Sequence, residues 1–149
     1  MMFNKILVPS DGSEPAERAG ENAISMADIS GGEIIILYVI DTSYLNALPQ
    51  QDLREKLDKE LRDEGKEIVE KFKKRLEDSQ CEGHCINVKL IPMIKEGKPA
   101  DVIIKTIDEE NVDMVTMGKS GKHGLEGLIL GNTTNRVVGA SKVPVHVVA

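Results

Sequence analysis

The stretch Val112-Asp-Met-Val-Thr-Met-Gly-Lys-Ser-Gly-Lys-His-Gly-Leu-Glu-Gly-Leu-Ile-Leu-Gly-Asn-Thr-Thr134 joins an apolar run, a glycine-rich segment and a short helical pattern. The apolar run over residues 112–117 predicts a buried strand. The segment that follows holds five of the chain's thirteen glycines, which let a backbone adopt positive φ angles and bring N–H groups close to a ligand. A helix that begins near Asn132 adds unpaired N–H groups and a positive dipole end. This combination predicts an anion site, best suited to phosphate.

The local charge agrees with an anionic ligand, although the chain as a whole has a formal net charge of −6. Only one acid, Glu126, accompanies four basic or titratable side chains: Lys119, Lys122, His123 and Arg136. The alternative is a glycine-rich surface loop that binds nothing, since such loops are common. The glycines by themselves leave both interpretations open.

Length and composition limit the classes of protein to consider. The 149 residues fall within the usual range for one domain, so we expect a single domain over residues 1–149. No apolar run approaches the roughly 20 residues that cross a bilayer, and no signal peptide pattern precedes the first strand. We therefore expect a cytoplasmic protein without a membrane partner. A pI near 5.1 and few aromatic residues argue against a nucleic-acid partner.

The first half of the chain alternates between strand and helix patterns. Residues 5–9 predict a buried strand that ends in a turn over residues 10–13, where a serine can cap the next helix. Small residues give that helix a smooth packing face, and Gly31 ends it. Residues 33–40 are apolar on both faces, as in a central strand of a parallel sheet. Residues 41–50 lack a clear period and predict a loop, and a long amphipathic helix follows, weakened at Gly65.

The second half repeats the alternation and completes the fold. Residues 86–94 predict an edge strand, because Pro92 lacks a backbone donor, and a helix follows over residues 99–110. After the strand at 112–117 come a helix over 132–140 and a last strand from Val143 to Val148. These elements predict a three-layer α/β/α fold with a five-stranded parallel sheet in the order 3-2-1-4-5. Ligands of such sheets bind beyond the carboxyl ends of the strands, where the loops after the first and fourth strands meet.

The motif Cys81-Glu-Gly-His-Cys85 is the only other cluster of potential ligands. It could supply half of a metal site, but no second pair of Cys or His residues completes the four ligands. Two unmodified thiols are the favoured interpretation, and a disulfide is an alternative in a hyperthermophile. The chain also lacks GxxxxGK[ST], HExxH and GxSxG segments, so the hydrolytic chemistry that these motifs support is not expected.

Five segments spread over the whole chain resemble the universal stress protein family of UspA domains. They are the opening Ile-Leu-Val-Pro-Ser-Asp-Gly-Ser, the strand end Leu-Tyr-Val-Ile-Asp, Glu-Gly-Lys-Pro-Ala, Val-Asp-Met-Val-Thr-Met-Gly and the final Val-Pro-Val-His-Val-Val. Members that bind ATP carry the pattern G-x2-G-x9-G-[S/T]. Gly118, Gly121 and Gly131 match this spacing, whereas Asn132 replaces the Ser or Thr. The resemblance implies a Rossmann-like fold of the adenine nucleotide alpha hydrolase-like type.

The resemblance also implies a ligand and its contacts. ATP or AMP would lie across the strand ends, with Asp11 near the ribose or an accompanying Mg or Mn ion and Val39 beside the base. Pro9 and Ser10 would form the first wall. The phosphates would be held by Met117, Gly118, Lys119, Ser120, Gly121, Gly131, Asn132 and Thr133. Family members commonly form homodimers through the last strand, which here runs from Val143 to Val148.

Three functions are consistent with this sequence. The first is a nucleotide-dependent regulatory module of the stress response, in which ATP or AMP orders the glycine loop. The second is a slow or partner-activated ATPase, although we find no convincing general base. The third is a dimeric interaction protein without a nucleotide, against which the three retained glycines count. If the glycines serve a phosphate site, replacing Gly118 or Gly121 with valine should weaken ATP binding while the fold survives.

Overall fold

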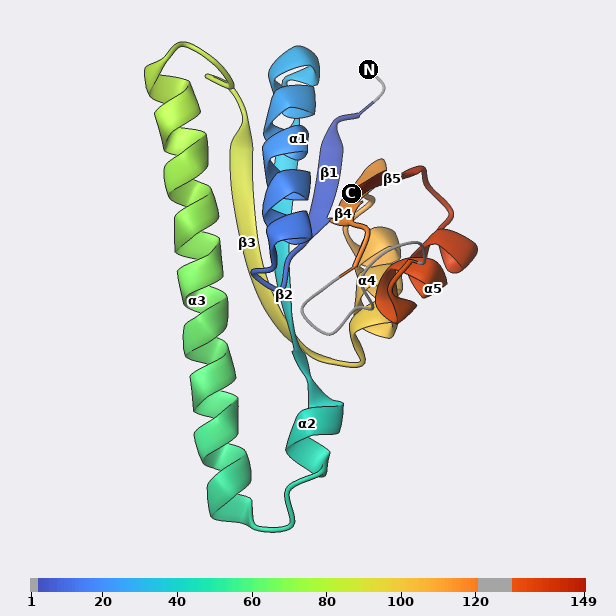
Figure 1. The fold of residues 1–149 in the computed structure, drawn as a ribbon. Helices are drawn as coiled ribbons and strands as arrows, with labels where there is room; N and C mark the ends of the chain where they lie inside the picture. Colours follow the sequence, from blue (N-terminus) through green and yellow to red (C-terminus); the bar gives the residue numbers. More distant parts are fainter. Residues whose placement is uncertain (1–2, 121–129) are drawn as a thin grey trace.

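The computed structural model describes residues 3–120 and 130–149 and contains a five-stranded parallel sheet between helices (Figure 1). The strands are β1 (Lys5–Pro9), β2 (Glu33–Asp41), β3 (Lys89–Gly97), β4 (Met114–Gly118) and β5 (Val145–Val148). The helices are α1 (Glu14–Ser30), α2 (Thr42–Asn46), α3 (Gln51–Cys81), α4 (Pro99–Glu109) and α5 (Asn132–Ala140). The order β3-β2-β1-β4-β5 confirms the predicted fold class and topology. Within these described ranges no helix is long and apolar enough to cross a membrane.

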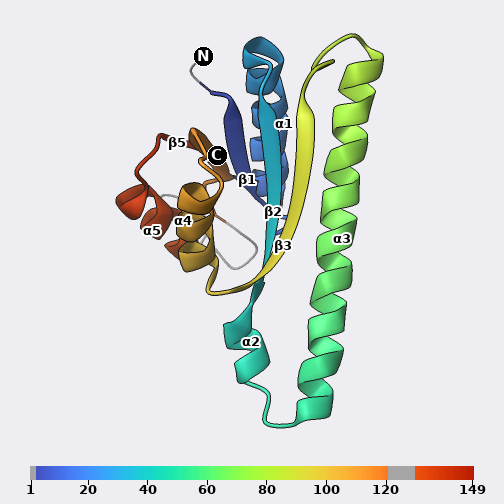
Figure 2. The same cartoon turned by 180° about the vertical axis from the view of Figure 1, so that it is seen from behind.

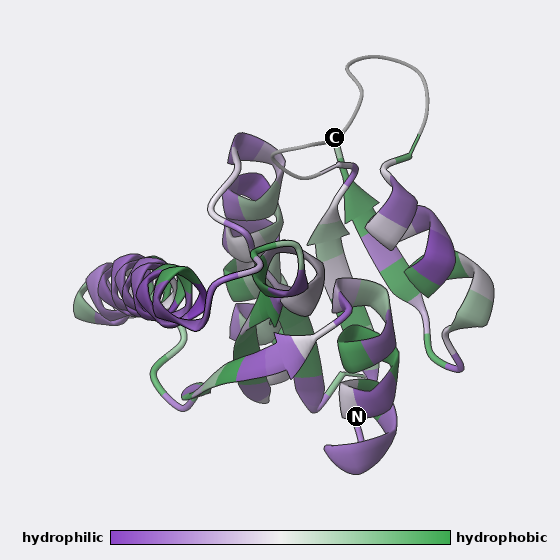
Figure 3. Ribbon diagram, turned by 90° about the horizontal axis from the view of Figure 1, so that it is seen from below, coloured by the Kyte–Doolittle hydropathy of each residue, from purple (hydrophilic) through white to green (hydrophobic). Residues whose placement is uncertain are grey.

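Each face of the sheet has its own hydrophobic core, because the central strands are apolar on both sides. On one face, Ile6, Val8 and Ile36 pack with residues of α1 and α3. On the other face, Leu7, Ile35 and Leu37 pack with α4 and α5. Figure 2 shows α4 and α5 together on one side of the strands. In Figure 3 the strands at the centre of the sheet are coloured mainly as hydrophobic residues, whereas α3 is coloured mainly as hydrophilic residues.

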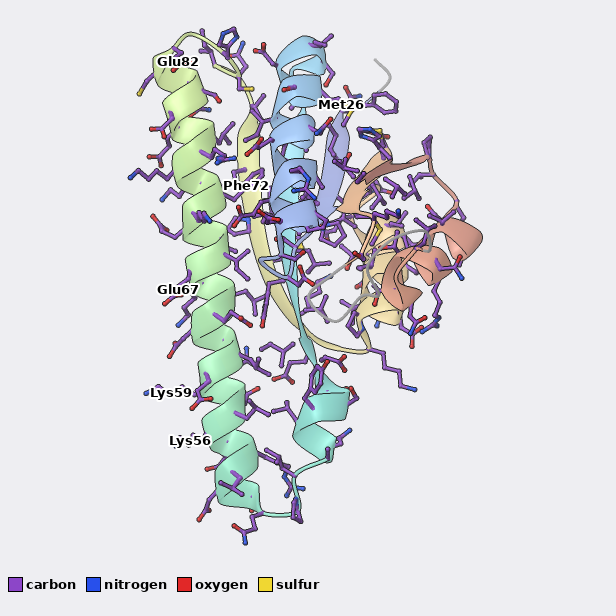
Figure 4. All side chains as sticks on the ribbon, in the orientation of Figure 1. Met26, Lys56, Lys59, Glu67, Phe72 and Glu82 are labelled. Carbon is purple, nitrogen blue, oxygen red and sulfur yellow. The ribbon has the colours of Figure 1, made fainter. Side chains whose placement is uncertain are left out.

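The small-residue face of α1 permits the close helix packing that the sequence predicts. Ala16, Ala19 and Ala23 are buried, and α1 ends at Gly31, whose φ of 71° is left-handed. Phe72 of α3 packs over this face, and a Cβ on Gly20 would lie 2.9 Å from its ring. Figure 4 shows Phe72 on the side of α3 toward the sheet, with Glu67 on the side turned away.

The long helix α3 continues through Gly65, where the sequence predicts a weak point. The helix runs through 31 residues without a break. Gly65 is buried, and a Cβ at this position would lie 2.6 Å from Cδ2 of Tyr38 in β2. Glycine therefore allows the helix backbone to approach the aromatic ring.

The predicted loop over residues 41–50 is wrong in part, because residues 42–46 form helix α2. Asp41 caps this helix by accepting a hydrogen bond from the Ser43 N–H at 2.9 Å. The Asp-Thr-Ser sequence is an N-cap signal that the missing hydrophobic period obscured. Figure 1 shows α2 and the first turns of α3 beyond the carboxyl ends of the strands.

Three strands begin two or three residues later than predicted. β3 begins at Lys89 after a turn in which Cys85 has a positive φ of 54°, and Ile86 is exposed. Val112 donates its N–H to the Ile107 carbonyl at the end of α4, so β4 begins only at Met114. Before β5, Ser141 Oγ forms hydrogen bonds with both backbone groups of Val143. Turn and helix-end hydrogen bonds thus replace sheet pairing at these positions.

Candidate functional site

The ends of β1 and β4 lie side by side at the centre of the sheet, where the strand order reverses. Ile6 is paired with Met114 and Leu7 with Val115, both in parallel register. After β1 the chain continues to α1 on one face of the sheet. After β4 it continues to α5 on the other face. The two loops therefore lie on either side of the place where this topology predicts a ligand, and we call that place the crevice. We call the loop at residues 10–13 the first wall and the segment comprising residues 118–120 and 130–134 the second wall.

The first wall is held by its own side chains. Pro9 ends β1, and the Ser10 N–H donates to the Leu37 carbonyl at 2.9 Å. The Ser10 hydroxyl accepts from the Gly12 N–H, and Asp11 Oδ1 accepts from the Ser13 N–H at 3.0 Å. Gly12 has a φ of 82°, which favours glycine. Ser10 and Asp11 are thus oriented before any ligand binds.

Helix α1 begins directly behind the first wall, but its N-terminus is not suited to an anion. The Ser13 hydroxyl caps it by accepting from the Ala16 N–H. Glu14 and Glu17 occupy the first turn and already compensate the positive end of the helix dipole. An additional anion here would meet two carboxylates.

The second wall rests directly on α1 through Gly118. A Cβ on Gly118 would lie 2.7 Å from the carbonyl carbon of Pro15 and 2.9 Å from the nitrogen of Ala16. Any side chain at this position would collide with backbone atoms, which cannot move cheaply. The prediction that Gly118→Val would leave the fold intact is therefore wrong, because Gly118 is needed for packing as well as for any ligand.

Backbone hydrogen bonds bring the two ends of the second wall together. The Gly131 N–H donates to the Lys119 carbonyl at 3.0 Å, and the Lys119 N–H donates to the Val148 carbonyl at 2.7 Å. The buried Thr134 hydroxyl donates to the Gly118 carbonyl at 2.9 Å. Sequence reasoning missed Thr134, whose only signal was a small hydroxyl residue one turn after Gly131.

Among the residues that the structure describes, the N-terminus of α5 has the features that an anion site requires. Gly131 is the N-cap residue, no side chain caps the helix, and its first turn contains no acidic residue. Asn132 is exposed at the first helical position, and its side chain does not cap the helix. Backbone N–H groups of the first turn therefore point toward the crevice without a side-chain acceptor from the cap residue.

The side of the crevice toward β2 is formed by a strand that continues past the end of β1. Pro9 is level with Leu37, and β2 runs on to Asp41. Val39 is half-buried and packs against the core on the α4 side. Met117 is buried in the same core, so its side chain contributes packing and only its backbone reaches the crevice.

The structure brings most of the predicted site residues together. Those that lie on the two walls and β2 are Pro9, Ser10, Asp11, Val39, Met117, Gly118, Lys119, Ser120, Gly131, Asn132 and Thr133. Gly121, Lys122, His123 and Glu126 lie outside the described residues. Arg136 does not add charge to the crevice as expected, because it pairs with Asp101 of α4 at 2.6 Å.

The cysteine motif lies apart from the crevice. Cys81 and Cys85 are free, and burial and the nearby charge of Asp28 raise the pKa of the Cys85 thiol. The Cys85 N–H and His84 hold the pKa of Asp28 below its usual range. Among residues 3–120 and 130–149, no group of three or more His, Cys, Asp or Glu side chains could hold a metal ion.

Comparison with known sequences gives a consistent family match. Residues 2–149 match the Universal stress protein family. The universal stress protein MJ0531 of Methanocaldococcus jannaschii is 33% identical over 147 residues, which cover 99% of this chain and 82% of the relative. The universal stress protein of Methanothermobacter thermautotrophicus is also 33% identical over 147 residues, covering 99% of this chain and 96% of the relative.

Solved structures share the fold. The structure of MJ0577, a universal stress protein of M. jannaschii, is 34% identical with a TM-score of 0.83, covering 99% of this chain and 96% of that one. A universal stress protein in complex with cAMP has a TM-score of 0.69 and 20% identity, with 99% and 98% covered. An Arabidopsis thaliana family protein with AMP bound has a TM-score of 0.65 and 20% identity, with 97% and 90% covered.

Proposed function

This chain belongs to the universal stress protein family, and we propose that it binds an adenine nucleotide, ATP or AMP, between the first and second walls. The observation that carries the proposal is the uncapped N-terminus of α5, which faces a first wall whose carboxylate and hydroxyl are already oriented. The second wall suits phosphates, and the first wall suits the hydroxyl groups of a ribose. Binding would act as the signal of a regulatory module in the stress response.

In this arrangement the phosphates lie on the second wall. The backbone N–H groups of the first turn of α5 bind them, beginning with those of Asn132 and Thr133. Gly118 has no side chain, which lets the backbone of the second wall come close to the phosphates. Gly131 keeps the N-cap free of a competing side chain. Lys119 and Ser120 lie where β4 ends and contribute a positive charge and a hydroxyl group to the same wall.

The nucleoside lies on the first wall and along β2. Asp11 accepts a hydrogen bond from the ribose or holds a Mg or Mn ion that accompanies the phosphates. Pro9 and Ser10 line the start of this wall, and Val39 offers an apolar contact to the base. The family members solved with cAMP and with AMP bound support the choice of an adenine nucleotide.

Calorimetric titration tests the proposal directly. ATP and AMP in the presence of Mg²⁺ should bind more tightly than adenosine, because the open end of α5 recognises phosphate. Asn132→Asp should lower the affinity for ATP by about tenfold, since it places a negative charge where the phosphates lie. Asn135→Asp makes the same change one turn later on α5 and serves as the matched control. Equal affinities for adenosine and AMP would contradict the proposed phosphate wall.

We further propose that a second copy of the chain pairs along β5. In the described sheet β5 is a terminal strand, hydrogen-bonded to β4 on one side only, and its residues are half-buried. The carbonyls of Pro144 and Val148 point toward β4, so the backbone groups of Val145 and Val147 point outward. Val147→Pro should give a monomer in light scattering, whereas Val147→Thr should remain a dimer. A monomeric unmodified protein would contradict this proposal.

A further inference from the structure

Tyr38 links the first wall to the middle of α3. It occupies β2 one residue past Leu37, whose carbonyl accepts the Ser10 N–H. The Tyr38 side chain crosses to the α3 side of the sheet, where its hydroxyl donates to Glu64 Oε2 at 2.6 Å. Tyr38 is only 4% exposed, so this is a protected hydrogen bond to a carboxylate, a strong kind.

The helix is shaped to receive this side chain. A Cβ on Gly65 would lie 2.6 Å from Cδ2 of Tyr38, so the backbone of α3 contacts the ring directly. One residue earlier, Glu64 accepts the hydroxyl. The ring and the hydroxyl are thus held by adjacent residues of one helix, which leaves Tyr38 little freedom to rotate.

The charge of the first wall reaches the same hydroxyl. Burial raises the pKa of Tyr38 above its ordinary value, and the hydrogen bond to Glu64, the charge of Glu64 and the charge of Asp11 raise it further. Asp11 follows Ser10 in the first wall, and the backbone hydrogen bond from Ser10 to Leu37 joins this wall to the residue before Tyr38 in β2. A ligand that moves the first wall would therefore act on β2 next to Tyr38.

The space behind the first wall is not filled by side chains. A cavity of about 40 Å³ lies between α1 and α3, with Ser10 and Gly12 on one side and Ile68 and Phe72 on the other. At its rim, Lys71 of α3 pairs with Glu17 of α1 at 2.6 Å, and Arg75 pairs with Glu21. Because this part of the first wall borders a cavity, the backbone hydrogen bond from Ser10 to Leu37, the residue before Tyr38 in β2, is a contact that fixes its position.

From these contacts we propose that Tyr38 is a positioning residue of the nucleotide site, which acts through Glu64 and couples ligand binding to the packing of α3. This inference rests on the proposed function. When the Tyr38–Glu64 bond holds α3 against β2, the first wall is ordered before binding, and the ligand does not have to supply the cost of ordering it. By reciprocity, a bound ligand stabilises the middle of α3. The stability of α3, whose outer face is charged, would then depend on whether the site holds a ligand.

The test compares four variants in two measurements with ATP and Mg²⁺ as the probe. Tyr38→Phe keeps the ring on Gly65 and removes only the hydroxyl, and Glu64→Leu removes the acceptor. Glu64→Gln removes the charge but keeps an acceptor oxygen for the hydroxyl. Glu67→Gln makes the same change at an exposed position of α3 (Figure 4) and is the matched control.

Calorimetry should show affinity weakened about three- to tenfold in Tyr38→Phe and Glu64→Leu, the size of one net hydrogen bond, with Glu64→Gln and Glu67→Gln near the unmodified protein. Hydrogen exchange of residues 60–72 should slow when ATP binds, and this response should be lost in the first two variants. A merely structural role would change the exchange rate without ligand but not the response to ligand.

Each outcome decides a different point. If the unmodified protein binds ATP and Tyr38→Phe shows the same affinity and the same exchange response, the coupling is wrong while the nucleotide site stands. If the unmodified protein binds no adenine nucleotide, the proposed function is wrong, and the coupling falls with it. That second result is obtained before any variant is made, so the two failures are distinguishable.

Discussion

Helices α1 and α5 both begin beside the same crevice, yet their N-termini are built differently. The N-terminus of α1 has a serine cap, a proline in its first turn and two glutamates, Glu14 and Glu17. That of α5 has a glycine as its N-cap residue, no side-chain cap and no acid in the first turn. In α1 the chain's own side chains compensate the N–H groups of the first turn, whereas in α5 these N–H groups have no side-chain acceptor from the N-cap residue and can bind a ligand.

This difference indicates which helix carries structure and which carries binding. A helix N-terminus attracts anions only where its own side chains do not already supply the negative end. Helix α1 also contacts the second wall, since Gly118 at the end of β4 lies against Pro15 and Ala16 at the start of α1. The structural helix thus serves as the support on which the second wall rests. Four substitutions test this division of roles, in order of decreasing expected effect.

The contact between Gly118 of the second wall and the start of α1 should give the largest effect. Gly118→Val should lower the free energy of unfolding by about 3 kcal/mol, because the new side chain would lie against backbone atoms of α1. Gly139 of α5 has no other atom within 4 Å of a built Cβ, so Gly139→Ala should be neutral or stabilising by up to about 1 kcal/mol. Urea denaturation measures both. Similar changes in the free energy of unfolding at the two positions would show that the second wall does not depend on its contact with α1.

The hydroxyl of Thr134 should give the next effect, because it holds the start of α5 onto β4. Thr134→Val keeps the shape but leaves the Gly118 carbonyl without this donor, at a cost of about 1 to 2 kcal/mol. Thr134→Ser keeps the donor and should lose less. Thermal unfolding compares the two variants, and a loss in Thr134→Ser as large as that in Thr134→Val would contradict a dominant contribution of this hydrogen bond.

Removing the cap of α1 should change stability without changing binding. Ser13→Ala loses the bond to the Ala16 N–H and should cost about 1 kcal/mol of unfolding free energy, whereas Ser13→Gly should cost only a few tenths. The affinity for ATP should stay the same in both, because α1 is not the anion-binding helix. A clear loss of ATP affinity in Ser13→Gly would contradict the assignment of α1 to structure and α5 to binding.

The sequence predicts the fold well where local signals and global packing agree. Residues 132–140 are predicted as a helix with the bounds that α5 has, and the apolar pattern of residues 33–40 correctly predicts a central strand. The meeting of the loops after β1 and β4 follows from strand order alone. These features depend on residues close together in the chain or on general rules of topology.

Contacts between distant residues account for what the sequence does not predict. Gly118 at the end of β4 lies against Pro15 of α1, and Arg136 of α5 pairs with Asp101 of α4, because elements from different parts of the chain meet there. Thr134 gives no recognisable pattern, since its role depends on the Gly118 carbonyl across the second wall. Glycine at 65 weakens an isolated helix, but here the ring of Tyr38 occupies the space that a side chain would need. Such roles become visible only in three dimensions.

Asn132 offers the smallest and most specific test, because it is where this chain departs from the ATP-binding pattern. Its side chain does not cap α5 and is exposed at the first helical position, so Asn132→Ser should hardly change stability. A serine hydroxyl is less bulky than the amide and leaves more room for a terminal phosphate. We therefore expect the affinity for ATP to rise more than that for AMP, by no more than about 1 kcal/mol, the size of one net hydrogen bond.

Calorimetry with both nucleotides measures this difference, and Asn135→Ser, one turn later on α5, is the control. Equal gains for ATP and AMP would show that position 132 does not contact the terminal phosphate. A loss of ATP affinity would show that the amide is itself a phosphate ligand, since an Asn side chain can donate two hydrogen bonds where a hydroxyl donates one. Either result would place a phosphate near the Asn132 side chain, whereas no change with either nucleotide would contradict a role of this side chain and leave the backbone N–H groups of α5 as the proposed phosphate contacts.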